Sequence, residues 1–124
     1  MGLTFDTGAL IALERRDVRM RKVLDTALAG RVVITVPTAV VCEWWRARSP
    51  RHEAILAMFT IEELDERLAR LAGEAMAAVP AATAIDAIVM ASAALRGDAV
   101  YTSDVGDLVR LRDGRFPGVR VLAV

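Results

Sequence analysis

The chain has 124 residues, 55% hydrophobic and 26% charged, and its 16 basic and 16 acidic side chains cancel to a formal net charge of zero. This composition excludes a disordered chain and predicts one globular domain over 1–124. Because zero net charge gives no overall attraction to a polyanion, a nucleic-acid substrate would have to meet a local basic patch.

Composition also bears on the compartment. The single cysteine, Cys42, excludes an internal disulfide, and we expect it to be a small buried hydrophobe. No basic region precedes the first strand, so we expect no signal peptide. The longest apolar run, 84–95, is interrupted by Asp86 and is too short to span a bilayer. We therefore expect a soluble, cytoplasmic protein with no membrane partner.

The first half of the chain alternates between strand and helix patterns. Residues 3–5 favour a short strand that Asp6 ends, with a turn at Thr7–Gly8. The β-branched run 31–36 is typical of a strand buried on both faces. Residues 59–64 predict a third strand at the sheet edge. One helix is expected from Ala9 to Arg15–Arg16, and a second between the caps Asp17 and Gly30. A third should run from Pro37–Thr38 to about Arg48. After a turn at Ser49–Pro50, a fourth, short helix is expected over 52–58.

The second half has clearer helix boundaries. Asp65 and Thr83 precede helices predicted over 66–78 and 84–96, and Gly97 follows the second. This alternation predicts an α/β fold with a mainly parallel sheet, for which right-handed crossovers favour a three-layer sandwich. Two further strands are predicted at 99–102 and 119–124, with a short helix at 104–110 between them.

Four acids are predicted to meet at one edge of this sheet. Asp6 ends the first strand, Asp104 follows the fourth, and Glu43 and Asp86 lie in early turns of crossover helices. Because parallel strands end at a common edge, all four carboxylates should lie there. Glu43 and Asp86 are the only charged residues within 32–45 and 84–95. An isolated carboxylate in such apolar surroundings is costly unless it is paired or bound to a metal.

The residue types indicate which metal and which chemistry. Carboxylate oxygens without histidine or cysteine suit a hard cation, Mg²⁺ or Mn²⁺. Mg²⁺ takes few carboxylates and keeps several waters, which leaves room for a substrate phosphate. Such an ion lowers the pKa of a bound water and neutralises charge on a phosphoryl group. The acids therefore predict metal-assisted phosphodiester hydrolysis without a covalent nucleophile.

The ordered set of motifs around these acids resembles a known family. Phe5-Asp6-Thr7, Val40–Glu43, Ala84–Ala91 and Val100–Asp104 follow the order and spacing of the PIN-domain nucleases. Among these, the chain resembles the VapC-type toxins of bacterial toxin–antitoxin pairs. The resemblance implies a parallel sheet of order 3-2-1-4-5 and a Mg²⁺-dependent endoribonuclease, usually dimeric. It also implies a cognate antitoxin that blocks the site, commonly by inserting a basic side chain among the acids.

The resemblance also assigns roles to individual residues. It carries catalytic and metal-binding roles over to Asp6, Glu43, Asp86 and Asp104. Thr102 corresponds to a hydroxyl that holds a ligand carboxylate or a water. Some relatives use an acid a few residues later, so Asp107 is either a substitute for Asp104 or a supporting partner. Val105–Gly106 departs from the polar residues frequent in relatives, which leaves this division open.

Each acid also has an interpretation that involves no chemistry. Asp6 is a typical N-cap, Asp86 suits the first turn of a helix, and Glu43 alone would be a surface charge. Their predicted convergence on one edge favours a functional site over three separate coincidences.

Basic and aromatic residues offer a surface for partners. The arginines near the first, second and third helices could hold RNA phosphates, although a solvated helix face is their commoner role. Of the adjacent Trp44 and Trp45, we expect one to pack and the other to meet a partner protein, a dimer mate or an RNA base. We expect His52 to lie on the surface without acidic partners.

Three other classes share part of the pattern. Asp6-Thr7-Gly8 is the tripeptide of aspartic proteases, but those are all-β proteins and this chain has a helical pattern. A phosphorylated receiver domain gathers acids at a strand end but needs a basic partner from a late strand, and the only lysine is Lys22. A catalytically inactive PIN-like module that binds RNA or protein is the alternative to the nuclease.

Overall fold

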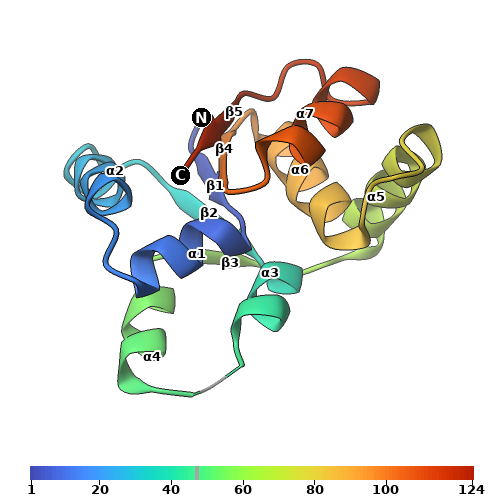
Figure 1. The fold of residues 1–124 in the computed structure, drawn as a ribbon. Helices are drawn as coiled ribbons and strands as arrows, with labels where there is room; N and C mark the ends of the chain where they lie inside the picture. The colour runs from blue at the N-terminus through green and yellow to red at the C-terminus, as the bar shows by residue number, and fades with distance from the viewer. Residues whose placement is uncertain (47) are drawn as a thin grey trace.

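Five short strands and seven helices make up the computed structural model, which describes residues 1–46 and 48–124 (Figure 1). The strands are β1 (Leu3–Phe5), β2 (Ile34–Pro37), β3 (Thr60–Glu62), β4 (Ala99–Thr102) and β5 (Val121–Ala123). The helices are α1 (Thr7–Glu14), α2 (Val18–Ala29), α3 (Thr38–Trp44), α4 (Pro50–Leu56), α5 (Glu66–Ala78), α6 (Ala84–Arg96) and α7 (Val105–Gly114).

The strands form one parallel sheet between two layers of helices. The strand order is β3-β2-β1-β4-β5, and every neighbouring pair is parallel. Helices α1, α2 and α4 cover one face and α5, α6 and α7 cover the other, while α3 lies between α1 and α6 (Figure 1). The predicted α/β class, three-layer arrangement and strand order 3-2-1-4-5 are confirmed.

Helix α6 explains the longest apolar run of the sequence. Its residues 87–93 are all buried, because α6 packs against α5, α7, α3 and the sheet. A helix that is apolar all round needs such contacts on every side. Asp86 lies in the first turn, just before this buried section, so α6 brings one carboxylate to the edge of the core. No helix in the described part of the chain is both long and apolar enough to cross a bilayer.

Several predicted boundaries are wrong, each for a local reason. Thr7 and Gly8 start α1 instead of forming a turn, since Asp6 already caps the helix. Strand β2 begins at Ile34 instead of residue 31, because Arg31 adopts a left-handed conformation (φ 55°) that closes α2. Helix α3 ends at Trp44, short of the predicted Arg48, and residue 47 lies outside the described residues.

Three further predictions are corrected. Ser49 is the N-cap of α4, and Pro50 opens that helix instead of forming a turn. Helix α7 runs on to Gly114, and β5 is shorter than the predicted 119–124. Cys42 is exposed, not buried, so it does not contribute to the core.

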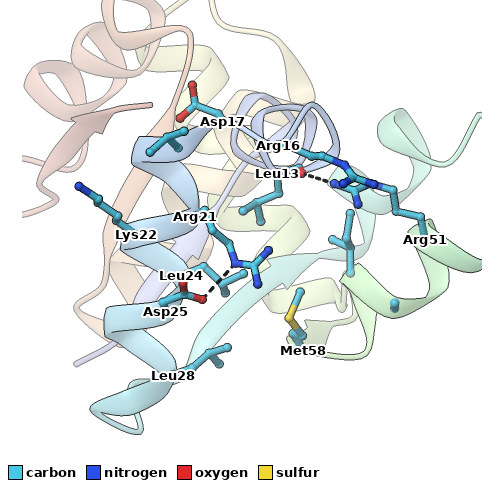
Figure 2. A pocket seen from close by; sticks show the side chains of 13 residues that line it. Leu13, Arg16, Asp17, Arg21, Lys22, Leu24, Asp25, Leu28, Arg51 and Met58 are labelled. Atoms are coloured by element: carbon cyan, nitrogen blue, oxygen red, sulfur yellow. Dashed lines mark hydrogen bonds and ion pairs between the residues drawn. The ribbon is translucent and has the colours of Figure 1, made fainter.

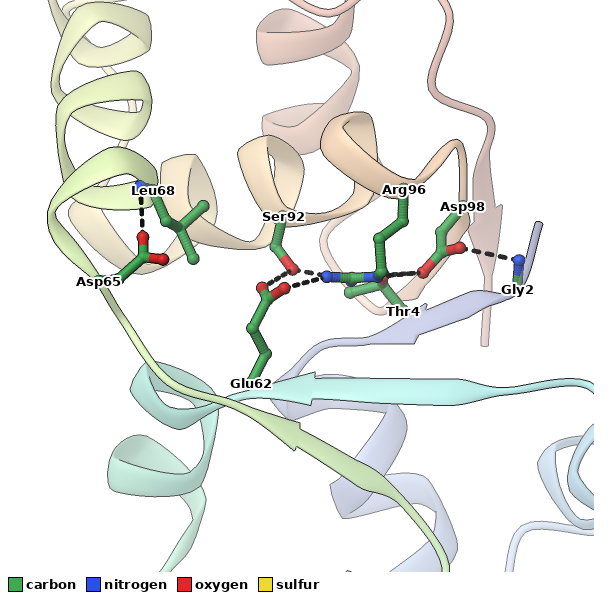
Figure 3. Close-up of polar contacts among 8 residues, drawn as sticks. All are labelled: Gly2, Thr4, Glu62, Asp65, Leu68, Ser92, Arg96 and Asp98. Carbon is green, nitrogen blue, oxygen red and sulfur yellow. Dashed lines mark hydrogen bonds and ion pairs between the residues drawn. The ribbon is translucent and has the colours of Figure 1, made fainter.

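A buried polar network connects β1, β3 and the end of α6 (Figure 3). The Arg96 guanidinium pairs with Glu62 and, at 2.9 Å, with the Asp98 carboxylate. It also donates to the Thr4 hydroxyl at 2.8 Å, which in turn donates to Asp98 at 2.9 Å. Asp98 accepts a further bond of 2.8 Å from the Gly2 amide. One arginine thus satisfies two acids and links segments distant in sequence.

We predict that Arg96→Ala lowers the free energy of unfolding by about 2–3 kcal/mol, because it leaves Asp98 buried without its cation. Urea unfolding at pH 7 measures this loss. Arg70→Ala is the matched control, since the Arg70–Glu66 pair is 76% and 77% exposed. Arg70→Ala should lower the free energy of unfolding by only about 0.5 kcal/mol. Equal losses in both variants would contradict a structural role for the network.

Candidate functional site

Asp6 lies at the C-terminal end of β1 and is the N-cap of α1. Its carboxylate accepts a hydrogen bond of 3.1 Å from the Ala9 amide, and its own amide donates to the Tyr101 carbonyl at 3.3 Å. The residue is only 6% exposed. The structure therefore shows the N-cap role considered for Asp6 in the sequence. Because capping alone does not require a buried charge, the burial needs another explanation.

Burial raises the pKa of Asp6 from 3.8 to about 6. Hydrogen bonds from the Thr102 hydroxyl and the Ala9 amide lower this pKa, whereas the charges of Asp86 and Asp104 raise it. Desolvation and like charges both favour the neutral carboxyl. Acids from β1, from α6 and from the segment after β4 thus lie within electrostatic reach of one another.

Asp86 and Glu43 extend this group of acids. Burial is the main reason that the pKa of Asp86 is raised, with further contributions from Asp107, Asp104 and Glu43. A hydrogen bond with Thr83, the N-cap of α6, opposes the rise. Glu43 is half-buried on α3. Asp86 therefore lies within electrostatic reach of Glu43 on α3 and of the two acids that follow β4.

Thr102 joins two of the acids. It is fully buried at the end of β4, and its hydroxyl oxygen accepts a bond of 2.8 Å from the Asp104 amide. The same hydroxyl is hydrogen-bonded to the Asp6 side chain. Asp104 and Asp107 are both exposed, and Asp107 pairs with Arg110 at 2.8 Å. Thr102 thus holds the ends of β1 and β4 in register beside Asp6.

The first turn of α1 is in direct contact with the segment after β4. A Cβ added to Gly8 would lie 2.2 Å from the Ser103 hydroxyl and 2.8 Å from the Ser103 amide nitrogen. Such distances are far below van der Waals contact, so position 8 admits only glycine unless α1 or the segment after β4 moves. Gly8 therefore permits the close approach that places Asp6 and Asp104 at the same edge.

A family model fits nearly the whole chain. The PIN domain model matches residues 3–114. The chain belongs to the PIN domain family. The resemblance drawn from the four acidic motifs is thereby confirmed at the level of the family.

Solved structures support the same fold. A chain of VapBC2 from Rickettsia felis, bound to a DNA fragment from its promoter, superposes with a TM-score of 0.78 at 12% identity and covers 100% of this chain and 99% of that one. A chain of DNA-bound VapBC from Salmonella typhimurium superposes with a TM-score of 0.77 at 14% identity, and the match covers 99% of this chain and 98% of that one. A toxin–antitoxin complex from Klebsiella pneumoniae gives 0.72 at 20% identity, with 96% and 95% covered. A search of curated protein sequences gives no significant match.

The donor set of this PIN domain fits a hard divalent cation in chemistry. The five acids Asp6, Glu43, Asp86, Asp104 and Asp107 supply only carboxylate oxygens, the ligands that Mg²⁺ prefers. Within residues 1–46 and 48–124, no group of three Asp, Glu, His or Cys side chains is in position to hold an ion as it stands.

Two contacts at the site were not predicted from the sequence. The Thr7 hydroxyl donates a short hydrogen bond to Glu43, which orients that carboxylate from the first turn of α1. The sequence predicts His52 at the surface without acidic partners, but it is half-buried, with Nε2 3.7 Å from Glu14 and its ring packed at a tilt against Trp44. The Thr7–Glu43 and Glu14–His52 contacts join residues more than 30 positions apart, so no local sequence signal could identify them.

Two hollows lie on the side of α1. The first, the α1–α3–α4 pocket, has a volume of about 280 Å³ and includes Thr7 and Glu43 in its lining. The second, the α2–α4 groove, has a volume of about 500 Å³ and contains none of the five acids (Figure 2). Figure 2 shows Leu24, Leu28 and Met58 at its wall, with Arg21 and Lys22 on α2 beside them. The pocket next to the acids is therefore the smaller of the two.

We predict that Asp6→Asn stabilises the metal-free domain above pH 6. The folded pKa of Asp6, about 6, exceeds its ordinary 3.8, so ionisation opposes folding as the pH rises through this window. Below pH 3.8 both states are protonated and the gain should vanish. At pH 8 it should reach up to about 3 kcal/mol, because Asn keeps the N-cap without the charge.

Urea unfolding in chelator between pH 4 and 8 measures this effect. Asp25→Asn is the control, because Asp25 is an exposed acid on α2 with 61% side-chain exposure. That control should show no such pH-dependent gain. An Asp6→Asn variant that is equally destabilised at every pH would show that the carboxylate acts as a structural cap alone.

Proposed function

We propose that this PIN domain is the toxin of a toxin–antitoxin pair and cleaves RNA as a Mg²⁺-dependent endoribonuclease. The observation that carries the proposal is the buried carboxylate of Asp6, which shares the edge of the sheet with Asp86 and Asp104. Structural ion pairs neutralise acids elsewhere in this domain, but the pKa of Asp6 and of Asp86 is raised. Carboxylates whose charge is disfavoured by the fold are candidates for metal binding or catalysis.

In this proposal Asp6, Glu43, Asp86 and Asp104 hold the ion, which when bound supplies a water of lowered pKa and neutralises phosphoryl charge. The hydroxyls of Thr7 and Thr102 orient Glu43 and Asp6. Asp107, paired with Arg110, supports Asp86 and Asp104 without contacting the ion. Mn²⁺ would suit the same oxygen ligands.

The likeness to the VapBC complexes supports a partner on another chain, a cognate antitoxin. The α2–α4 groove adds an observation of its own. Around it, Val18 is 70% exposed, Leu28 43% and Met58 39%, a concentration of apolar surface typical of a protein interface. Four basic and two acidic side chains surround these residues, which favours an acidic amphipathic segment: Arg16, Arg21, Lys22 and Arg51 against Asp17 and Asp25.

The resemblance to VapC-type toxins also supports a homodimer and a cytoplasmic location. Light scattering of the purified protein measures the oligomeric state, and fractionation of the source cells tests the cytoplasmic location. The alternative is a PIN module without catalysis that binds RNA or protein. Intact acids at the sheet edge favour the nuclease, because such a module has no need of them.

We predict that Asp6→Asn and Asp86→Asn each abolish metal-dependent cleavage of a mixed cellular RNA pool. Thr102→Val should lower the rate by about 10- to 100-fold, the usual effect of losing a residue that orients a ligand. Gel analysis of fragments in Mg²⁺, in Mn²⁺ and in chelator measures these effects. Asp113→Asn, an acid of α7 with 66% side-chain exposure, should cleave like the wild type.

The wild type could also leave RNA uncut. Failure to cleave in either metal, with the protein folded, would favour the binding module. Cleavage by Asp6→Asn at the wild-type rate would overturn the assignment of the acids.

We predict that Met58→Glu prevents formation of the antitoxin complex, because it places a charge in the apolar wall of the α2–α4 groove. RNA cleavage should continue, since the groove contains none of the five acids. Co-purification with the antitoxin encoded beside the toxin measures the complex. Glu74→Gln, on α5 at the opposite face, is the control. An antitoxin complex of wild-type affinity in Met58→Glu would exclude the groove as its binding site.

A further inference from the structure

The α1–α3–α4 pocket adjoins the acidic edge. Thr7 and Glu43 line it, and the hydrogen bond between them places one wall of the pocket beside the proposed metal ligands. The volume of about 280 Å³ lies at the lower limit of ligand pockets, roughly 300 Å³. A space of this size holds one small ligand and excludes a helix or a strand of a partner.

Aromatic rings form the opposite wall. The rings of Trp44 and His52 line the pocket and pack at a tilt of 39° with centroids 4.6 Å apart. The Trp45 ring lies behind them, 6.0 Å from each, and does not line the pocket. Glu14 fixes this wall by accepting from the Trp44 indole at 3.0 Å and lying 3.7 Å from His52. The Ser49 hydroxyl holds the other ring nitrogen of His52 at 2.6 Å. The wall is therefore rigid before any ligand binds, which lowers the entropic cost of binding.

Two arginines provide positive charge at the same pocket. Arg15, at the end of α1, and Arg46, just after α3, are both exposed and line it. Arg46 donates from Nε to the backbone carbonyl of Glu43 at 3.1 Å, which keeps its guanidinium near that acid. Guanidinium groups bind phosphate oxygens in a bidentate manner. The acids beside the pocket would repel a phosphate, so these cations mark where one can approach.

We propose that this pocket binds the nucleotide next to the scissile phosphate and thereby selects where the RNA is cut. The base lies in the pocket at the partly exposed His52 ring, behind which Trp44 is buried at 4% exposure, and the flanking phosphate lies at Arg15 and Arg46. Single-stranded RNA is commonly recognised by bases that stack on aromatic side chains and on arginine planes. The inference rests on the proposed ribonuclease function, but binding at the pocket can be measured without cleavage.

The first test uses the intrinsic fluorescence of the pocket. Trp44 and Trp45 are the only two tryptophans of the chain, so the signal comes from the pocket wall and from the ring directly behind it. AMP, GMP, CMP and UMP are titrated separately into the wild type in chelator. At least one should change the emission saturably, and inorganic phosphate should not. Arg46→Ala and Arg15→Ala should each weaken binding about tenfold, the effect of one charge-assisted contact, whereas Arg70→Ala should bind as the wild type does.

The second test maps fragment ends from a randomised RNA oligonucleotide in Mg²⁺. Arg46→Ala should raise KM and broaden the set of cut positions, and Arg70→Ala should reproduce the wild-type positions. No fluorescence change with any of the four nucleotides would overturn the proposal. Unchanged cut positions in Arg15→Ala and Arg46→Ala would overturn it as well. So would loss of the antitoxin complex as the only effect of these two variants. Nucleotide binding without RNA cleavage would support the assignment of the pocket as a nucleotide site and contradict the assignment of the protein as a nuclease.

Discussion

The buried carboxylate of Asp6 is the constraint on which the functional edge of the sheet depends. Its hydrogen bond to the Ala9 amide starts α1, and its amide continues the pairing of β1 with β4 through Tyr101. The same burial raises the pKa of Asp6 to about 6, so the ionised side chain destabilises the metal-free fold. A cation at this edge would relieve the cost while leaving the cap and the strand pairing in place.

Acids occupy two contrasting environments in this domain. Glu62, at the end of β3, and Asp98, just after α6, share the Arg96 guanidinium. Glu62 also accepts a hydrogen bond from Ser92, and Asp98 accepts from Thr4 and Gly2. At the edge of the sheet, Asp6, Glu43, Asp86 and Asp104 form no ion pair within residues 1–46 and 48–124, and Asp107 pairs only with the exposed Arg110. The difference separates acids that stabilise the chain from acids that we propose to bind a ligand, and it depends on which partners the fold provides, not on residue type.

Local signals explain why some elements were predicted at their observed boundaries. Asp65 and Thr83 cap α5 and α6, and Gly97 ends α6 with a φ of 73°, so each end is determined within a few residues. The errors arose where the decisive contact is distant or unusual. Arg31 takes a left-handed conformation that non-glycine residues seldom adopt, and His52 is half-buried because it packs against Trp44 and beside Glu14.

The same distinction separates the candidate site into a part that sequence predicts and a part that it does not. Asp6, Asp86 and Asp104 could be placed at one edge because strand direction and helix order alone bring them there. The pocket beside them depends on the packing of α4 against α1, which sequence periodicity does not report. Because its net charge is zero, the chain can attract a polyanion only through a local positive patch. Arg15 and Arg46 provide such a patch at the pocket that Glu43, one of the proposed metal ligands, also lines. The chemistry of such a nuclease is therefore encoded in topology, and its choice of substrate in tertiary packing.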